Sequence, residues 1–165
     1  MEALIAVLLI YICIYGGFII ALIIGYNRIK SYKTKSSSAE TSFSIIIPFR
    51  DEQMNLHDFL ESIALLDYPR DKFELIFVDD NSADFSVNVI NKWRMANGLI
   101  QTTLIENLRL SKSPKKDAIT RAMPIIENKW IITTDADCIV KPKWLQTFNS
   151  YILEHDVYML AGSFI

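Results

Sequence analysis

The sequence of 165 residues has few glycines, cysteines and histidines, and each shortage excludes a class of site. The five glycines form no GxGxxG pattern, which excludes the glycine-rich phosphate loop of dinucleotide-binding folds. The two cysteines, Cys13 and Cys138, provide no disulfide framework, and each is interpreted as a small apolar residue. The two histidines, His57 and His155, have neither a nearby nucleophile nor metal-ligand spacing. A net charge of −2 argues against broad nucleic-acid binding.

Charged side chains are absent from residues 3–26. This stretch exceeds the roughly 20 apolar residues that cross a bilayer as a helix. A secretory signal peptide, the alternative, needs a basic start, a shorter apolar core and a small-residue cleavage site, whereas this chain starts with Met1-Glu2. The pattern predicts a retained transmembrane anchor over residues 1–27.

Basic residues follow this expected anchor and are missing from the segment that precedes it. They are Arg28, Lys30, Lys33 and Lys35. The other flank offers only Glu2 and the terminal amine. Because basic residues are retained on the cytoplasmic side, the amino terminus is expected outside and the rest of the chain in the cytoplasm. We therefore expect a single-pass protein of the cell membrane, in which residues 28–42 form a basic juxtamembrane segment and polar linker.

Residues 43–165 alternate between short apolar runs, typical of buried strands, and stretches with helical periodicity. The expected strands are residues 43–49, 73–78, 99–106, 129–135 and 157–165. The expected helices are residues 56–64, residues 85–93, a helix that begins at Pro114 with Ser113 as its cap, and residues 141–155. This alternation predicts an α/β domain, a mostly parallel sheet with helices on both faces, in which ligands bind beyond the carboxyl ends of the strands.

Asp135 and Asp137 follow the fourth expected strand and are separated by the small residue Ala136. In an extended chain residues i and i+2 point to the same side, so the two carboxylates are expected to converge. Convergent carboxylates suit Mg²⁺, which shares the rest of its coordination shell with water and substrate phosphates and neutralises a leaving diphosphate. The pair alone leaves open the alternative of a solvent-exposed turn.

Asp79 and Asp80 end the second expected strand. A carboxylate at that edge of the sheet is suited to accept hydrogen bonds from the base or ribose of a nucleoside. In the alternative interpretation Asp80, Asn81 and Ser82 only cap the helix that follows.

Lys115 and Lys116 lie in the first turn of an expected helix, where cations oppose the helix dipole. This placement indicates an anionic partner, because lysines and a helix amino terminus together form a phosphate site. A solvated basic loop is the alternative.

The segment 48–52, which follows the first expected strand, is also compatible with an ordinary acidic start of a helix.

Four motifs in this order resemble those of the family 2 glycosyltransferases, which have the GT-A fold. The motifs are FSIIIPFRDEQMNL, ELIFVDDNSAD, SKSPKKDAITRA and WIITTDADCIVKPKWL. The resemblance covers about residues 43–165. It implies a Rossmann-like sheet and an enzyme that transfers a sugar from a nucleotide-sugar donor, most often a UDP-sugar, with the help of Mg²⁺ or Mn²⁺.

The same resemblance implies roles for individual residues. Those expected to bind the donor are Pro48, Arg50, Glu52, Asp80, Lys115 and Asp135. Asp80 would recognise the nucleobase, and Lys115 matches the lysine that precedes an Ala-Leu-Asn motif in the family. Asp137 would be the main metal ligand, with Asp135 also at the metal and nearer the ribose and diphosphate.

Family members usually continue beyond the Asp-x-Asp motif with an acceptor pocket and an acidic general base. We therefore expect the base to lie beyond Ile165, and residues 43–165 to be the nucleotide-sugar-binding half of a glycosyltransferase domain whose acceptor is unknown. One alternative is a non-catalytic nucleotide-binding module that recruits a partner to the membrane. Another is a phospho-accepting receiver domain. In that fold the expected strand at residues 43–49 would have no counterpart, and this sequence leaves no room for the lysine that such a domain requires later in the chain.

Overall fold

The structure of the protein, a computed structural model, describes residues 2–28, 32, 34 and 38–162. The chain divides into two compact units, residues 1–33 and 34–165. Of the predicted basic flank, Arg28 is among the described residues, whereas Lys30, Lys33 and Lys35 lie outside them.

The first unit is one long helix, α1, which spans Glu2–Asn27. At 1.5 Å per residue, its 26 residues extend about 39 Å, more than the roughly 30 Å hydrocarbon core of a bilayer. Its mean hydropathy reaches 2.8 over an 18-residue window, and none of its side chains is buried within the protein. The helix is therefore long and apolar enough to cross a membrane, a criterion that a signal sequence near an amino terminus also meets.

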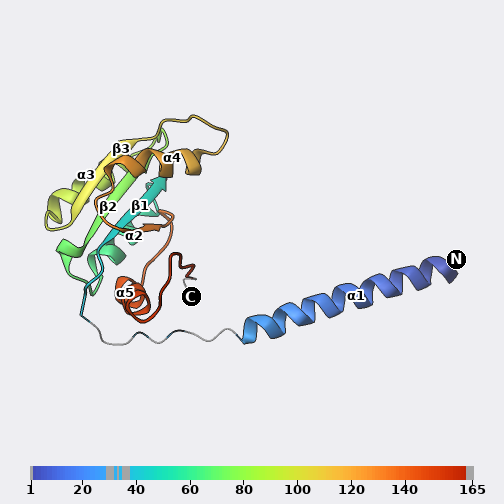
Figure 1. The fold of residues 1–165 in the computed structure, drawn as a ribbon. Coiled ribbons are helices and arrows are strands. Elements are labelled where there is room, and N and C mark those ends of the chain that lie inside the picture. The colour runs from blue at the N-terminus through green and yellow to red at the C-terminus, as the bar shows by residue number, and fades with distance from the viewer. Residues whose placement is uncertain (1, 29–31, 33, 35–37, 163–165) are drawn as a thin grey trace. The chain divides into compact units, whose positions relative to one another are not determined.

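The second unit contains a four-stranded sheet in the order β3-β2-β1-β4 (Figure 1). The strands are β1 (Phe43–Phe49), β2 (Phe73–Asp79), β3 (Gln101–Glu106) and β4 (Trp130–Thr133). All three neighbouring pairs are parallel. The chain builds the sheet outward from β1 through β2 to β3 and then returns to the other side of β1. The switch point, where parallel sheets bind ligands, thus lies between β1 and β4.

Helices cover both faces of this sheet, which confirms the predicted fold class. They are α2 (Leu56–Ala64), α3 (Ser86–Ala96), α4 (Pro114–Ala122) and α5 (Trp144–Glu154), with short 3₁₀ turns at Arg70–Lys72 and Met123–Ile125. Residues of α2, α3 and α5 share one apolar cluster with the sheet, and α4 packs on the opposite face.

The alternating side chains of β1 explain why its sequence is a continuous apolar run. Ile45 and Ile47 pack in the cluster that contains Phe59 of α2. Ile46 points the other way and packs in the cluster that contains Ala118 and Ala122 of α4. Because both faces are covered by helices, the side chains on both faces of Ile45–Ile47 are apolar.

Two details of the expected helices and strands are wrong. Residues 157–162 form no strand, and the remaining part of that expected strand, 163–165, lies outside the described residues. Tyr158 and Met159 in this segment are 92% and 84% exposed. An apolar pattern is therefore not sufficient to form a strand where no neighbouring strand provides backbone hydrogen bonds. The side chain of Ser113 makes no capping hydrogen bond. The helix begun at Pro114 ends at Ala122, and the 3₁₀ turn that follows contains Pro124.

Glu74 is a buried carboxylate at the end of the sheet opposite the carboxyl edge, only 3% exposed. It accepts hydrogen bonds from the hydroxyl of Ser44, from the backbone N–H of Glu127 at 3.1 Å and from the side-chain amide of Asn128 at 3.2 Å. These contacts connect β1, β2 and the segment that leads into β4. They offset the free energy that burying a carboxylate costs.

Replacing Glu74 by alanine is predicted to lower the free energy of unfolding by roughly 2–4 kcal/mol, because the buried hydroxyl of Ser44 and the part-buried donors of Glu127 and Asn128 then lose their acceptor. The measurement is urea denaturation of the full chain in detergent micelles, followed by tryptophan fluorescence. Glu61→Ala, at an exposed position of α2, is the matched control and should change the value by less than about 0.5 kcal/mol. Equal midpoints for the two variants would contradict the stabilising role of Glu74.

Candidate functional site

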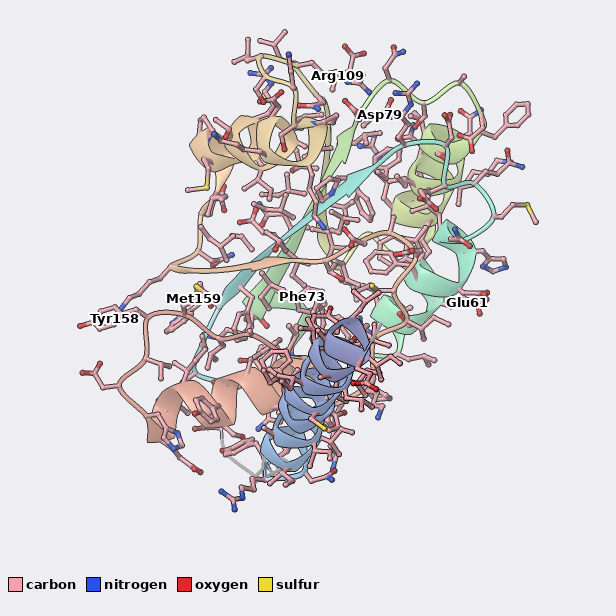
Figure 2. The ribbon with its side chains drawn as sticks, turned by 90° about the vertical axis from the view of Figure 1, so that its right-hand side faces the viewer. Glu61, Phe73, Asp79, Arg109, Tyr158 and Met159 are labelled. Atoms are coloured by element: carbon pink, nitrogen blue, oxygen red, sulfur yellow. The ribbon has the colours of Figure 1, made fainter. Side chains whose placement is uncertain are left out.

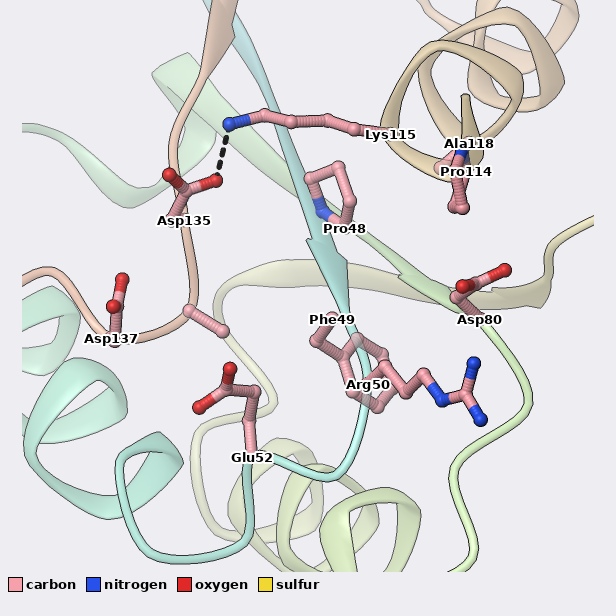
Figure 3. A pocket seen from close by; sticks show the side chains of 11 residues that line it. Pro48, Phe49, Arg50, Glu52, Asp80, Pro114, Lys115, Ala118, Asp135 and Asp137 are labelled. Carbon is pink, nitrogen blue, oxygen red and sulfur yellow. Dashed lines mark hydrogen bonds and ion pairs between the residues drawn. The ribbon is translucent and has the colours of Figure 1, made fainter. Parts of the chain in front are cut away.

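A pocket of about 260 Å³ lies at the carboxyl edge of the sheet (Figure 3). Segments that are far apart in the sequence line it: the ends of β1 and β2, the first turns of α4 and the turn after β4. Its lining residues are Pro48, Phe49, Arg50, Glu52, Asp80, Pro114, Lys115, Ala118, Asp135, Ala136 and Asp137. All seven residues that the sequence nominated as donor or metal ligands are in this set. Phe49, Pro114, Ala118 and Ala136 were not nominated.

Pro48 explains why the sheet opens at this place. The backbone of Ile46 faces β4, and its carbonyl accepts the N–H of Thr134 at 3.2 Å. Two residues later Pro48 faces the same side, because backbone groups alternate along a strand, and proline has no N–H to donate. The ladder between β1 and β4 therefore ends, and β4 leaves the sheet while β1 continues beside β2 to Phe49.

The loops that follow β1 and β2 are joined by hydrogen bonds. The backbone N–H of Asp51 donates to the hydroxyl of Ser82 at 3.1 Å, and the carboxylate of Asp51 accepts the N–H of Ala83 at 2.7 Å. The N–H of Glu52 donates to the buried hydroxyl of Ser86 at 2.9 Å. These contacts hold the two loops in one arrangement, so that Glu52 from one loop and the end of β2 face the same pocket.

Two residues in these loops adopt the left-handed backbone region that favours glycine. Asp51 has φ of 54° and Asn81 has φ of 64°. Aspartate and asparagine tolerate this region better than other non-glycine residues, at a cost of order 1–2 kcal/mol. Both residues follow the carboxyl ends of strands, and the sharp turns they make redirect the chain at the edge of the pocket.

Asp80 is a buried carboxylate at one side of the pocket, 7% exposed. It accepts hydrogen bonds from the guanidinium of Arg109 and from the side-chain amide of Asn107. The hydrogen bond from Arg109 is the main cause that lowers the pKa of Asp80 against the opposing effect of burial, and the charge of Arg50 adds to it. Asp80 is therefore ionised at neutral pH.

The alternative that Asp80 serves to cap helix α3 does not hold. Asp84, and not Asp80, accepts a hydrogen bond from the start of α3: its carboxylate accepts the N–H of Ser86, the first residue of the helix, at 2.9 Å. The carboxylate of Asp79 accepts the N–H of Ser82 within the turn, also at 2.9 Å.

Lys115 lies in the first turn of α4 and forms an ion pair with Asp135, with Nζ and Oδ1 2.5 Å apart (Figure 3). Both side chains are about half exposed, at 55% and 53%, so solvent screens the pair and it adds little to stability. Its consequence is local. The pair holds the ammonium group of Lys115 beside the amino end of α4, where the helix dipole also favours an anion.

Asp135 and Asp137 are carried by a turn and not by extended chain, contrary to the expectation from their spacing. The N–H of Cys138 donates to the carbonyl of Asp135 at 3.3 Å, which closes the turn. Ala136 between them is buried, 3% exposed, and both carboxylates line the pocket. The two residues do share one site, but the turn brings them there.

The carboxylates of Asp135 and Asp137 fit a divalent cation that takes the rest of its ligands from a substrate. The described residues contain no group of three or more histidine, cysteine, aspartate or glutamate side chains arranged to hold a metal. Two carboxylates, Asp135 and Asp137, line the pocket on one side, as Figure 3 shows. Mg²⁺ is commonly bound by one or two carboxylates with the remaining positions filled by phosphate oxygens and water.

Arg109 and Asn107 contact a pocket residue but were not nominated from the sequence. Their segment follows β3 at the same edge of the sheet, near Asp79 in Figure 2. The basic residues around them were interpreted as phosphate ligands, whereas Arg109 pairs with Asp80. Asp117 of α4 keeps the segment in place by accepting the N–H groups of Leu110 and Ser111 at 3.0 and 2.8 Å. No pattern in the sequence predicted these contacts between segments that are far apart along the chain.

The parallel sheet with a pocket that charged residues line at its switch point defines a Rossmann-like α/β protein. The sequence profile described as "Glycosyl transferase family 2" matches residues 44–165. The chain belongs to this family, which confirms the resemblance noted in the motifs and makes the receiver-domain alternative wrong.

Two curated relatives illustrate the similarity. The poly(ribitol-phosphate) beta-N-acetylglucosaminyltransferase TarS of Staphylococcus aureus is 27% identical over 113 residues, which cover 68% of this chain and 19% of TarS. Glycosyltransferase AglE of Haloferax volcanii is 23% identical over 120 residues, covering 73% of this chain and 38% of AglE. The chain thus matches only about a fifth to two fifths of the length of these relatives.

Solved structures share the fold. The crystal structure of residues 1–349 of S. aureus TarS has a TM-score of 0.61 at 25% identity and covers 69% of this chain and 33% of that one. The mannosyltransferase PcManGT from Pyrobaculum calidifontis, solved with GDP-Man and Mn²⁺, has a TM-score of 0.62 at 24% identity and covers 73% and 35% of the two chains. The sheet and helices of residues 34–165 therefore have GT-A-like neighbours.

Proposed function

We propose that the chain is the donor-binding part of a membrane-anchored glycosyltransferase that uses a UDP-sugar and a divalent cation, Mg²⁺ or Mn²⁺. The observation that carries the proposal is that all seven residues nominated from four separate motifs line one pocket. Membership of the family supports glycosyl transfer as the reaction class. The crystal structure of TarS in complex with UDP-GlcNAc, 25% identical over the shared region, supports a uridine nucleotide-sugar as the donor.

The pocket has two chemically different sides, and the donor is oriented accordingly. In Figure 3 Asp80 and the guanidinium of Arg50 lie on one side, and Asp135 and Asp137 lie on the other. We assign the nucleoside to the first side, where Asp80 accepts hydrogen bonds from the base and Pro48 provides an apolar surface. The diphosphate extends toward the second side, with Glu52 along the wall between them.

Lys115 and the amino end of α4 are assigned to the diphosphate. The ammonium of Lys115 already lies at the pocket in its pair with Asp135, and it pairs with a phosphate oxygen when the donor binds. Asp137, with Asp135, is assigned to the cation. When bound, the cation neutralises the negative charge that develops on the leaving diphosphate.

The reaction joins an acceptor oxygen to the anomeric carbon of the sugar and breaks the bond from that carbon to the diphosphate. A general base must remove the proton of the acceptor hydroxyl. We assign this base to none of the seven nominated pocket residues, and the chain matches only about a fifth to two fifths of the length of these relatives. The residues of the pocket then hold and orient the donor, and Lys115 stabilises the departing group.

Replacing Asp137 by alanine is predicted to abolish metal-dependent binding of UDP, because a single carboxylate is left to hold the cation. Isothermal titration calorimetry of the full chain in detergent micelles, with UDP and Mn²⁺, is the measurement. Asp71→Ala, exposed in the turn before β2 and far from the carboxyl edge, is the matched control and should bind as the original protein does. Unchanged binding by the Asp137 variant would refute the assignment.

Replacing Lys115 by glutamine is predicted to weaken UDP binding about 10- to 100-fold, the size of a charge-assisted hydrogen bond, and to leave uridine binding within about twofold. The readout is the ratio of the two dissociation constants, again by calorimetry. Lys116→Gln is the control, since Lys116 is the neighbouring residue but does not line the pocket. A parallel loss for UDP and uridine would place Lys115 away from the diphosphate.

We further propose that α1 crosses the cell membrane once, with residues 28–42 and the domain in the cytoplasm. A carboxyl-terminal epitope tag is then predicted to resist protease in right-side-out vesicles and to be degraded after detergent permeabilisation. An amino-terminal tag should be degraded in both cases, and the chain should stay with the membrane during carbonate extraction. Loss of the carboxyl-terminal tag in sealed vesicles would show the opposite orientation.

A further inference from the structure

The polar linker that precedes β1 is fastened to the domain by one buried side chain. Asn149 of α5 is fully buried, and its Oδ1 accepts the backbone N–H groups of Glu40 at 3.2 Å and Thr41 at 3.0 Å. Its Nδ2 donates to the carbonyl oxygen of Ser38 at 2.8 Å. The side-chain amide binds the linker backbone as a neighbouring strand would, so residues 38–41 are part of the domain.

Two further contacts hold the linker. The hydroxyl of Tyr68 donates to the carbonyl oxygen of Thr41 at 2.6 Å, and burial raises the pKa of Tyr68 to about 12, so the hydroxyl keeps its proton. The hydroxyls of Thr34 and Thr147 are 2.6 Å apart. Only residues 28–33, here called the tether, then separate the end of α1 from the first of these contacts. A stretch of that length spans at most roughly 20 Å.

The tether reaches the domain at the amino edge of the sheet, which is the edge opposite the pocket. Thr41 lies just before Phe43, the first residue of β1, whereas Pro48 and Phe49 at the other end of the strand line the pocket. Figure 1 shows the chain entering β1 at the end away from the arrowhead. The seven residues of β1 extend about 23 Å, more than the tether can span. The tether therefore favours an orientation in which the amino edge lies nearer to the membrane that α1 is proposed to cross.

Three large apolar side chains are exposed at this amino edge. Helices that follow the strands of a parallel sheet run back along it, so their last turns lie at the amino edge. Leu65 follows the last residue of α2 and is 70% exposed. Met95 in the last turn of α3 is 84% exposed, and Leu99 in the loop before β3 is 85% exposed. Removing side chains of this size from water is favourable.

The segments that carry these side chains, residues 65–72 and 94–100, are nearly neutral. Their charged residues are Arg70, Lys72, Arg94, Asp67 and Asp71. Long basic side chains keep their charge at the level of the lipid headgroups while apolar neighbours enter the boundary of the acyl chains. The composition of the edge thus fits the surface of a bilayer and does not depend on one lipid charge.

We infer that Leu65, Met95 and Leu99 lie in the interfacial region of the membrane that anchors the chain, and that the pocket opens away from it toward the cytoplasm. This inference rests on the proposed membrane anchor. Exposed apolar side chains also occur at the carboxyl edge, where Met54 is 82% and Leu110 is 77% exposed. The short tether and its entry at the amino edge favour the first surface over the second.

The test places one fluorescent probe at either edge of the full chain in vesicles of phosphatidylcholine and phosphatidylglycerol. Cys13→Ala and Cys138→Ala remove the native thiols. Leu99→Cys or Met54→Cys then introduces one site for a nitrobenzoxadiazole probe, at positions of nearly equal exposure. A nitroxide on the lipid headgroup quenches a probe that reaches the interface. The probe at residue 99 is expected to lose about half of its fluorescence or more, and the probe at residue 54 to stay nearly unchanged.

Substitution of the neighbouring side chains tests the surface itself. Leu65→Ser combined with Met95→Ser, both at exposed positions, should reduce the quenching of the probe at residue 99 about twofold or more, because less apolar surface enters the interface. Leu110→Ser, exposed at the carboxyl edge, is the matched control and should leave the quenching unchanged. Equal quenching in the double variant and the original chain would overturn the assignment of these side chains.

The outcomes separate this inference from the proposed donor site. Equal quenching of the two probes, stronger quenching at residue 54 or quenching at neither position would overturn the inference. Calorimetry with UDP and Mn²⁺ on the same vesicles tests the pocket independently, and the donor site would stand if UDP still bound. Release of the chain from the vesicles by carbonate extraction would refute the membrane anchor and this inference together.

Discussion

The ladder between β1 and β4 ends at Pro48, and the candidate site depends on this interruption. Up to Ile46 the two strands are paired, and two residues later Pro48 offers no N–H to the neighbouring strand. β4 therefore turns away from the sheet, and the turn that carries Asp135 and Asp137 lies across the end of β1. A residue with an N–H at position 48 would permit the ladder to continue into the space that the pocket occupies.

Two of the carboxylates around this opening are paired with cationic side chains. Asp80 is paired with Arg109, and Asp135 is paired with Lys115. These two pairs differ in a way that matters for function. The carboxylate of Asp80 is buried and bound by two N–H groups of one guanidinium, which favours the constant geometry that the proposed recognition of a base requires. The Lys115 pair is exposed and rests on one contact, so its ammonium is free to move to a phosphate.

Much of the fold was predictable because the packing of a parallel sheet leaves a strong pattern in the sequence. β1 and β2 are covered on both faces and appear as mostly apolar runs, interrupted by Ser44 and Glu74, and α2 shows helical periodicity. The seven nominated site residues were predictable as a group, because carboxyl ends of parallel strands share one edge. The failures have physical reasons. The apolar pattern of residues 157–162 is not sufficient for a strand, since strands form only beside a neighbour. Asp135 and Asp137 converge through a turn, which spacing alone cannot distinguish from extended chain.

The sequence by itself determined the class of fold, the family and which edge of the sheet carries the polar residues, because each depends on periodicity or on motifs within short segments. It also determined the apolar character of α1, which is a property of composition. Only the tertiary structure decided that Arg109 and Asn107 pair with Asp80, that Glu74 connects three segments, and that the loops after β1 and β2 are joined. These contacts link residues about 27 to 54 positions apart, and no local pattern specifies which distant partner a polar side chain meets. The identity of such partners follows from packing, which exists only once the chain has folded.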